Sequence, residues 1–340
     1  MEMSLFLCLH CIVLIHTASG IPGSHPLLRR LAEISYIPIA SRLYPSTSAS
    51  NFSSEAKDPH HDVKINLIFA RLQARLLATD TAQRFFARAS VYGLPSYDNL
   101  LFRDNYILSY DGRLKHPSWV IENFAGRQSR AADRFYFKGT FRTDLNLPEN
   151  LRSRYRDYLH TGYDRGHLAP VCDSMSSKEQ VNEACLMSNI APQVRNLNGG
   201  GCAWTRLESY ALYLAHQSED FYVISGTLYM PTTSASDDPG SQSVMVHRVI
   251  GSKRLIGVPT HYYKIMLSKN EYEKLSMEAF LLPNSEAVDR SARIEQFQVD
   301  IDKDLPEIER TAGLRFFELI DRNRIVRSRM IRDFGSNSGT

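Results

Sequence analysis

Residues 163–170 read Tyr163-Asp164-Arg165-Gly166-His167-Leu168-Ala169-Pro170, which places an acid, a guanidinium and an imidazole within one short stretch of this 340-residue chain. The planar fork of donors on Arg165 suits a pair of phosphate oxygens. His167 can accept a proton near neutral pH, and Gly166 lets the backbone approach a ligand closely. The alternative is a surface ion pair beside a structural histidine, so the surrounding sequence must decide between them.

A second group of motifs lies further along the chain. Ser188-Asn189-Ile190-Ala191-Pro192-Gln193 leads to Asn198, and Trp204-Thr205-Arg206-Leu207-Glu208 follows. In this order and spacing the motifs resemble the sugar-non-specific DNA/RNA nucleases of the ββα-metal (His-Me finger) fold, and within them the mitochondrial endonuclease G group. Further matches between about residue 92 and residue 320 resemble the exonuclease-G-like branch of that group.

The resemblance implies an α+β fold with mixed or antiparallel sheets, flanked by helices and containing a ββα-metal active-site motif. It also implies a Mg²⁺-dependent nuclease, with Mn²⁺ as an alternative ion, that hydrolyses phosphodiester bonds of DNA and RNA. On the matching positions, His167 would be the general base that activates water, and Arg165 would support charge in the transition state. Asn198 would hold the metal, and Glu208 is expected at the metal as well, orienting water; Asp164 would share this orienting role. The resemblance further implies a homodimer.

Each of these roles has a structural alternative. A lone Asn before a Gly tract is commonly a turn residue, and a helical Glu such as Glu208 commonly makes an i,i+4 pair. Arg206 fits a phosphate contact and an ordinary ion pair equally well. The segment Gly199-Gly200-Gly201-Cys202 lengthens the gap after Asn198 relative to the family, so we expect a more mobile loop and weaker metal binding. The chain also keeps Asp164 where the exonuclease-G-like branch has Ser, which leaves endonuclease and 5′-exonuclease modes open.

Charge is clustered although the net charge is only +3. Between residues 127 and 165 there are nine Lys or Arg against five Asp or Glu, with aromatic residues interspersed. Basic side chains with aromatic neighbours suit a nucleic-acid backbone. We therefore expect Arg152, Arg154 and Arg156, together with Arg206, to bind DNA and RNA, the alternative being a solvated face over core aromatics.

The five cysteines form no disulfide framework and no zinc-ligand pattern. Cys8 and Cys11 lie in an apolar leader, and we expect Cys172, Cys185 and Cys202 to be reduced thiols. Reduced thiols favour an intracellular compartment over an oxidising one.

The N-terminus carries conflicting targeting signals. The apolar run from Leu5 to Ile15 is typical of a secretory signal or a short membrane anchor, but no Lys or Arg precedes it. Residues 27–54 are rich in Ser, poor in acids and contain Arg, which is typical of mitochondrial import. We expect a mitochondrial protein of the inner membrane or intermembrane space, with inner-membrane association through the apolar run. Secretion is the alternative, and Asn51 would then be a glycosylation acceptor.

The chain divides into four predicted parts: a leader and linker at 1–60, a helical extension at 61–92, a nuclease domain at 93–322 and a basic tail at 323–340. Apolar periodicity predicts helices, and these are Asp62–Ala89, Ser177–Met187, Ala203–Gln217 and Leu305–Ile320. Short β-branched or aromatic runs predict strands, and these are Tyr106–Tyr110, Trp119–Asn123, Phe135–Phe141, Phe221–Leu228, Val244–Ile250 and Tyr262–Leu267. The active-site motif would combine a strand carrying His167, a strand near Leu186–Ile190 and the helix from Ala203.

Two other functions remain open at this point. One is a catalytically weak nucleic-acid-binding protein of the same fold, which the longer Gly loop favours. The other is a secreted scavenging nuclease with the same chemistry. A P-loop, a G-x-S-x-G elbow and a zinc-finger pattern are all absent from the sequence.

Overall fold

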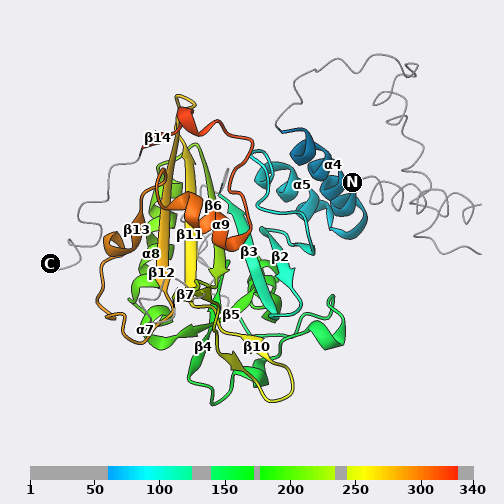
Figure 1. Ribbon diagram of the computed structural model, residues 1–340. Helices are drawn as coiled ribbons and strands as arrows, with labels where there is room; N and C mark the ends of the chain where they lie inside the picture. Colours follow the sequence, from blue (N-terminus) through cyan, green and yellow to red (C-terminus); the bar gives the residue numbers. More distant parts are fainter. Residues whose placement is uncertain (1–59, 125–138, 172–176, 234–242, 328–340) are drawn as a thin grey trace, which may run out of the picture. The chain divides into compact units, whose positions relative to one another are not determined.

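The computed structural model describes residues 60–124, 139–171, 177–233 and 243–327 (Figure 1). Their contacts place them in one unit that spans residues 58–340. The predicted leader, most of the predicted strand at 135–141 and the end of the basic tail lie outside the described residues. Among the basic residues between 127 and 165, those at positions 127, 130, 134 and 138 lie outside them too.

A large antiparallel sheet forms the middle layer of this unit. Its strands run in the order β1 (Leu100–Phe102), β2 (Tyr106–Asp111), β3 (His116–Asn123), β6 (Asp220–Leu228), β11 (His261–Lys269), β12 (Leu275–Pro283) and β13 (Gln298–Val299). A short strand, β14 (Val326–Arg327), pairs with β12 in parallel. The described part of the chain therefore has the expected α+β class, with sheets that are mainly antiparallel.

The sheet carries an apolar core on each face because side chains alternate along a strand. In β6, Tyr222 and Ile224 belong to the core that packs against the helices α5 (Asp80–Ala89) and α9 (Leu305–Ala312). Phe221 and Val223 point the opposite way, into a second core that contains the buried side of helix α8 (Ala203–His216). Nearly every residue of β6 is therefore buried, because packed side chains cover both faces of the strand.

The predicted strand, strand and helix around His167 are present on the α8 side of the sheet. Strand β4 (Tyr163–His167) pairs antiparallel with β5 (Ile190–Val194), which places His167 opposite Ile190. The second strand begins later than the predicted Leu186–Ile190, because Met187–Asn189 forms a 3₁₀ turn. A short helix α7 (Arg195–Asn198) and the Gly loop then lead into α8.

The predicted helix Asp62–Ala89 is wrong as a single element. It is two helices, α4 (His61–Leu77) and α5 (Asp80–Ala89). Ala78 is extended, and the Thr79 hydroxyl caps α5 by accepting a hydrogen bond from the Ala82 N–H at 3.1 Å. Both helices pack into the core beside β1, β2 and β3 (Figure 1).

Three other boundaries also differ from the predictions. Helix α9 (Leu305–Ala312) ends well before the predicted Ile320, because Gly313 adopts the left-handed conformation that terminates helices. The predicted strand Val244–Ile250 is two short pieces, β8 (Ser243–Val244) and β9 (Val249–Ile250), which pair with β7 (Thr232–Thr233) and β10 (Ile256–Gly257). The described end of the predicted strand Phe135–Phe141 is not a strand. Helix α6 (Lys178–Ala184) lies within the predicted Ser177–Met187.

Candidate active site

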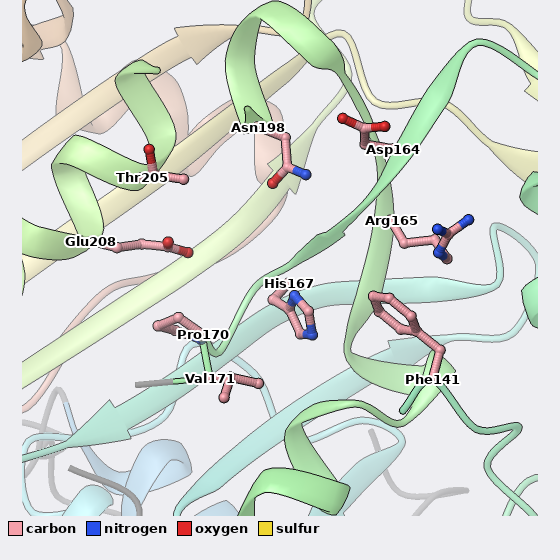
Figure 2. Close-up of a pocket in the computed structure, with 9 residues that line it drawn as sticks. All are labelled: Phe141, Asp164, Arg165, His167, Pro170, Val171, Asn198, Thr205 and Glu208. Carbon is pink, nitrogen blue, oxygen red and sulfur yellow. The ribbon is translucent and has the colours of Figure 1, made fainter. Parts of the chain in front are cut away.

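A pocket of about 430 Å³ opens beside β4, α7 and α8 (Figure 2). Its lining contains every residue that we assigned to catalysis or metal binding, from three separate elements. The lining residues are Phe141, Asp164, Arg165, His167, Pro170, Val171, Asn198, Thr205 and Glu208.

Strand β4 presents Arg165 and His167 on one side because alternate residues of a strand share a face. Gly166, between them, is buried against Gln193 of the neighbouring strand β5. A Cβ atom on Gly166 would lie 2.0 Å from Gln193 Oε1. We predicted that this glycine serves the approach of a ligand, but in the structure it makes room for a protein side chain.

Phe141 contacts both functional residues of β4. Its ring stacks on the His167 ring at 5.2 Å between centroids, with 27° between the planes. The Arg165 guanidinium carbon lies 5.0 Å from the centroid of the same Phe141 ring. This phenylalanine therefore packs against the base and the cation of the pocket at once.

Arg165 packs against two neighbouring aromatic rings, Phe141 and Tyr155, whose centroids lie 6.4 Å apart. Besides Phe141, the ring of Tyr155 lies 4.5 Å from the guanidinium carbon, a distance at which cation–π attraction is substantial. Among the described residues no acid pairs with Arg165, and its buried Nε has no hydrogen-bond partner. The two rings therefore hold the guanidinium from adjacent sides, and no described acid competes with an anion for it.

His167 is neutral at physiological pH. Burial, and then the positive charge of Arg165, lower the pKa of His167 to about 4. The Trp204 indole N–H donates to the His167 carbonyl oxygen at 3.3 Å, and His167 Nε2 lies 3.8 Å from Cys185 Sγ. A neutral imidazole held at its backbone can accept a proton from water.

Asn198 ends the short helix α7, and its side chain points into the pocket toward His167 (Figure 2). The glycine loop after it is tied down by hydrogen bonds within the described chain. Thr205 Oγ1 donates to the carbonyl oxygens of Gly199 at 3.3 Å and Cys202 at 3.0 Å. The extra loop residues are thus fastened at both ends, next to the Asn198 amide.

Glu208 projects from α8 into the pocket from the side opposite Arg165 (Figure 2). Burial raises the pKa of Glu208 and the positive charge of Lys264 lowers it in part, so that the net pKa is about 7. Lys264 is only 1% exposed, and its Nζ lies 4.5 Å from the Trp204 ring centroid. This buried ammonium, which also donates to Ser225 Oγ at 2.6 Å, offsets part of the cost of ionising Glu208.

The pocket can hold a hard cation. Its oxygen donors are the Asn198 amide and the carboxylates of Glu208 and Asp164, and oxygen ligands supplemented by water are what Mg²⁺ prefers. Asp164 accepts a hydrogen bond from the exposed Arg195 at 3.4 Å. Within the described ranges no three His, Cys, Asp or Glu side chains gather as a metal-binding group. The donor set therefore fits Mg²⁺ held by few protein ligands better than a closed zinc site.

The four arginines predicted to bind nucleic acid are separated by the structure. Arg152 donates to the carbonyl oxygens of Leu147 and Leu145, at 2.5 and 2.9 Å. Arg206 donates to the Ser291 and Ala292 carbonyl oxygens at 2.9 and 3.2 Å. Arg154 and Arg156 instead line a second pocket, which shares Phe141 with the first.

A sequence model of the DNA/RNA non-specific endonuclease family matches residues 87–323, which include the whole pocket. The chain belongs to this family. The nuclease is 35% identical over 232 residues to a protein named "Nuclease" from Syncephalastrum racemosum, covering 67% of this chain and 70% of that relative. It is 33% identical over 225 residues to human "Endonuclease G, mitochondrial", covering 66% of this chain and 71% of the relative.

A solved structure of the EndoG/EndoGI complex resembles this nuclease in three dimensions. The TM-score is 0.63 at 32% sequence identity, and the match covers 71% of this chain and 94% of the other. The nuclease is accordingly a hydrolase of DNA and RNA with the ββα-metal nuclease fold.

Sequence reasoning missed several residues around the pocket of this nuclease. Phe141, Tyr155 and Cys185 reach the two β4 side chains from segments with no motif of their own. Lys264 was not singled out either, although a Lys in the middle of an apolar strand is itself a signal, because a buried ammonium requires compensating partners. The two described cysteines, Cys185 and Cys202, are free thiols, in agreement with the prediction for them.

Proposed function

We propose that this nuclease hydrolyses phosphodiester bonds of DNA and RNA with Mg²⁺, using His167 as general base and Asn198 as a metal ligand. The observation that carries the proposal is the convergence of His167, Arg165, Asn198 and Glu208 on one pocket. Incubation with circular plasmid, linear DNA and RNA, with and without Mg²⁺, tests it. A purified, folded protein that degrades none of them would leave the alternative of a nucleic-acid-binding protein with little turnover.

The charge of each side chain in the pocket determines the part proposed for it in the reaction. His167, neutral because its pKa is low, takes a proton from the attacking water. Arg165 donates two parallel hydrogen bonds to the phosphate as negative charge grows on it. Asn198 and Glu208 would hold Mg²⁺ and orient water around it, with Asp164 in support. Bound there, Mg²⁺ supplies positive charge that stabilises the leaving oxygen.

Asn198→Ala is expected to lower the apparent affinity for Mg²⁺ by at least about tenfold, since even groups that only support metal ligands contribute about 10–100-fold. The loss should be partly restored by raising the Mg²⁺ concentration, because the variant lacks a ligand and keeps the proton acceptor. Titration of the cleavage rate with Mg²⁺ measures this.

The matched control is Asn196→Ala on the same short helix. Its amide donates to the Glu286 carbonyl oxygen at 2.8 Å and does not line the pocket. We expect its Mg²⁺ titration to match that of the unmodified protein. If Asn198→Ala is equally impaired at every Mg²⁺ concentration, Asn198 is not a direct ligand.

The nucleic-acid backbone is proposed to continue from the catalytic pocket over Phe141 into the second pocket, where Arg154 and Arg156 lie. Neutralising both, as Arg154→Gln/Arg156→Gln, should weaken binding to DNA and RNA alike. The slope of log affinity against log salt should fall by about 0.9 for each lost phosphate contact on duplex DNA. Anisotropy titrations at several salt concentrations measure the slope.

Arg152→Gln is the control for that pair, because the Arg152 guanidinium already bonds to two backbone carbonyls. It should lower the melting temperature and leave the salt slope unchanged. An unchanged slope in the Arg154/Arg156 variant would place the nucleic-acid path elsewhere. Arg206, engaged with carbonyls of residues 291 and 292, is proposed to contribute mainly by holding α8.

We further propose a homodimer, as the family resemblance implies. Support comes from a group of exposed apolar side chains around β8, β9 and β10, namely Val244, Met245, Val246, Val249 and Leu255. Contiguous exposed apolar surface is typical of subunit interfaces. A monomeric mass by light scattering would contradict this proposal.

A mitochondrial location is proposed from the import-like N-terminal segment and from the mitochondrial name of a relative. No helix in the described ranges is long and apolar enough to cross a membrane. The four-part division at residues 60, 92 and 322 also remains a proposal. Imaging of a C-terminally tagged full chain distinguishes mitochondria from secretion, and the products on circular and linear DNA distinguish endonuclease from exonuclease action.

A further inference from the structure

Helix α4 has two apolar faces although only one of them packs on the rest of the protein. Val63, Ala70 and Ala74 are buried, and Ala70 and Ala74 belong to the core shared with α5 and the sheet. These positions recur at helical spacing and account for the attachment of α4 to the domain.

The second face points away from that core. It consists of Ile65, Ile68, Phe69 and Leu72, which neighbour one another at three- and four-residue spacing. Ile68 is 43% exposed and Phe69 is 47% exposed. None of the four belongs to an apolar core cluster of the described residues. Single exposed apolar residues are ordinary, but a contiguous stripe on one helix needs a partner.

Positive charge lies along one edge of this stripe. Arg71 and Arg75 are exposed, one turn apart, and follow Ile68 by three and seven residues. Neither has an acidic partner among the described residues. The opposite edge carries Asp62, Asn66 and Gln73, of which only Asp62, in the first turn of the helix, is charged. An apolar stripe with a basic edge is the pattern of helices that lie in the interface of an anionic membrane.

The position of α4 in the chain separates this face from catalysis. The family match begins at residue 87, after α4 ends. None of the α4 residues lines the catalytic pocket or the pocket that contains Arg154 and Arg156. The outward face is therefore an addition to the nuclease core and not a part of its active site.

We propose that the outward face of α4 docks on a membrane surface that contains anionic lipid, with Ile68 and Phe69 in the interface and Arg71 and Arg75 against the headgroups. Charge complementarity selects this occupant. A second copy packed antiparallel on the same face would bring two sets of arginines together, and like charges oppose that contact. A nucleic acid would pair with the arginines but would leave most of the apolar stripe uncovered.

Co-sedimentation of the full chain with vesicles tests the proposal. Vesicles of phosphatidylcholine alone are compared with vesicles that also contain phosphatidylglycerol, and the fraction bound is measured at several salt concentrations. We expect binding to the anionic vesicles that weakens with salt. Ile68→Ser/Phe69→Ser should lower the partition coefficient by about tenfold or more. Arg71→Gln/Arg75→Gln should lower it by about fivefold for each arginine, on anionic vesicles only.

Asn66→Ser/Gln73→Ser is the matched control, because it places the same residue type on the polar edge of the same helix. It should bind vesicles like the unmodified chain. Circular dichroism and the rate of plasmid cleavage should be unchanged in all three variants, since the face lies outside the active site. These two measurements separate loss of docking from loss of folding.

Three results would overturn the proposal. Equal vesicle binding by Ile68→Ser/Phe69→Ser and the unmodified chain would assign membrane binding, if any, to another part of the protein. A change of that variant from dimer to monomer, without an effect on vesicles, would assign the face to a second copy. A lower affinity of Arg71→Gln/Arg75→Gln for DNA, with vesicle binding intact, would assign it to nucleic acid.

Discussion

His167→Ala is expected to reduce the rate of phosphodiester cleavage by about 10²–10⁴-fold, the usual contribution of a general base. The pKa of His167 is lowered to about 4, chiefly by burial, so the unmodified residue is already unprotonated at neutral pH. Alanine removes the proton acceptor and leaves Arg165, Asn198 and Glu208 in place. Single-turnover cleavage of a labelled duplex measures the loss.

Binding of nucleic acid should survive this substitution, because the imidazole is assigned to water and not to phosphate. Anisotropy measured without Mg²⁺ should give a dissociation constant within a few-fold of the unmodified protein. Since the His167 ring packs on Phe141, the melting temperature must be recorded to exclude collapse of the pocket. His216→Ala, an exposed histidine at the end of α8, is the control and should cleave normally. Cleavage by folded His167→Ala at the normal rate would remove His167 from the mechanism.

The part of the site that could be predicted from sequence is the part that is nearly continuous along the chain. His167 lies on β4, Asn198 on α7 and Glu208 on α8, and among the described residues β5 is the only strand between them. Because β4 pairs with β5, the chain returns to the side of His167 before α7 and α8 begin. Residues spaced in this way along the sequence therefore lie close together in the fold. The alternation within β4 also follows from sequence, since any strand separates Arg165 from Gly166.

The aromatic contacts of Arg165 could not be predicted in the same way. Phe141 reaches Arg165 from a segment that is neither helix nor strand, and Tyr155 reaches it from a 3₁₀ turn. Neither segment has a periodic sequence pattern. Which aromatic ring meets which cation is decided by the packing of loops against β4. The composition of the basic segment showed that aromatic residues lie among the basic ones, but it could not show which aromatic ring would contact Arg165.

Charge counting likewise could not separate the arginines by role. Arg152, Arg154 and Arg156 alternate along the sequence and look equivalent there. In the structure Arg152 satisfies two backbone carbonyls, Arg154 pairs with the exposed Glu149 at 2.8 Å, and Arg156 is exposed. An exposed pair such as Arg154 with Glu149 contributes little to stability, so Arg154 can exchange its partner for phosphate. Whether a guanidinium is already engaged depends on tertiary contacts.

The predicted helix boundaries were wrong where a capping residue or a glycine interrupted the apolar periodicity. The pattern through residues 62–89 is continuous, but Thr79 caps a new helix and interrupts it. The pattern through 305–320 continues past Gly313, which ends the helix in a left-handed conformation. Both signals are present in the sequence, and a Thr or Gly within an apolar run should receive more weight than the run itself.

Arg165→Lys should reduce the cleavage rate by about 10²–10³-fold although it preserves the charge, because removing one preorganised donor from a transition state commonly has that effect. The two rings that contact Arg165 favour a flat guanidinium, with distances of 5.0 Å to the Phe141 centroid and 4.5 Å to the Tyr155 centroid. An ammonium group is compact and strongly hydrated, and it cannot present two parallel donors to a phosphate. The loss should therefore appear in the rate at saturating substrate.

Two companion variants separate this geometry from charge alone. Tyr155→Leu keeps the guanidinium but removes one of the two rings that contact it, so we expect an intermediate loss of rate. Arg195→Lys changes an exposed arginine at the rim, which bonds to Asp164 at 3.4 Å, and should leave the rate near normal. If Arg165→Lys also cleaves at a near-normal rate, a positive charge at this position is sufficient, and the orientation imposed by Phe141 and Tyr155 has no part in catalysis.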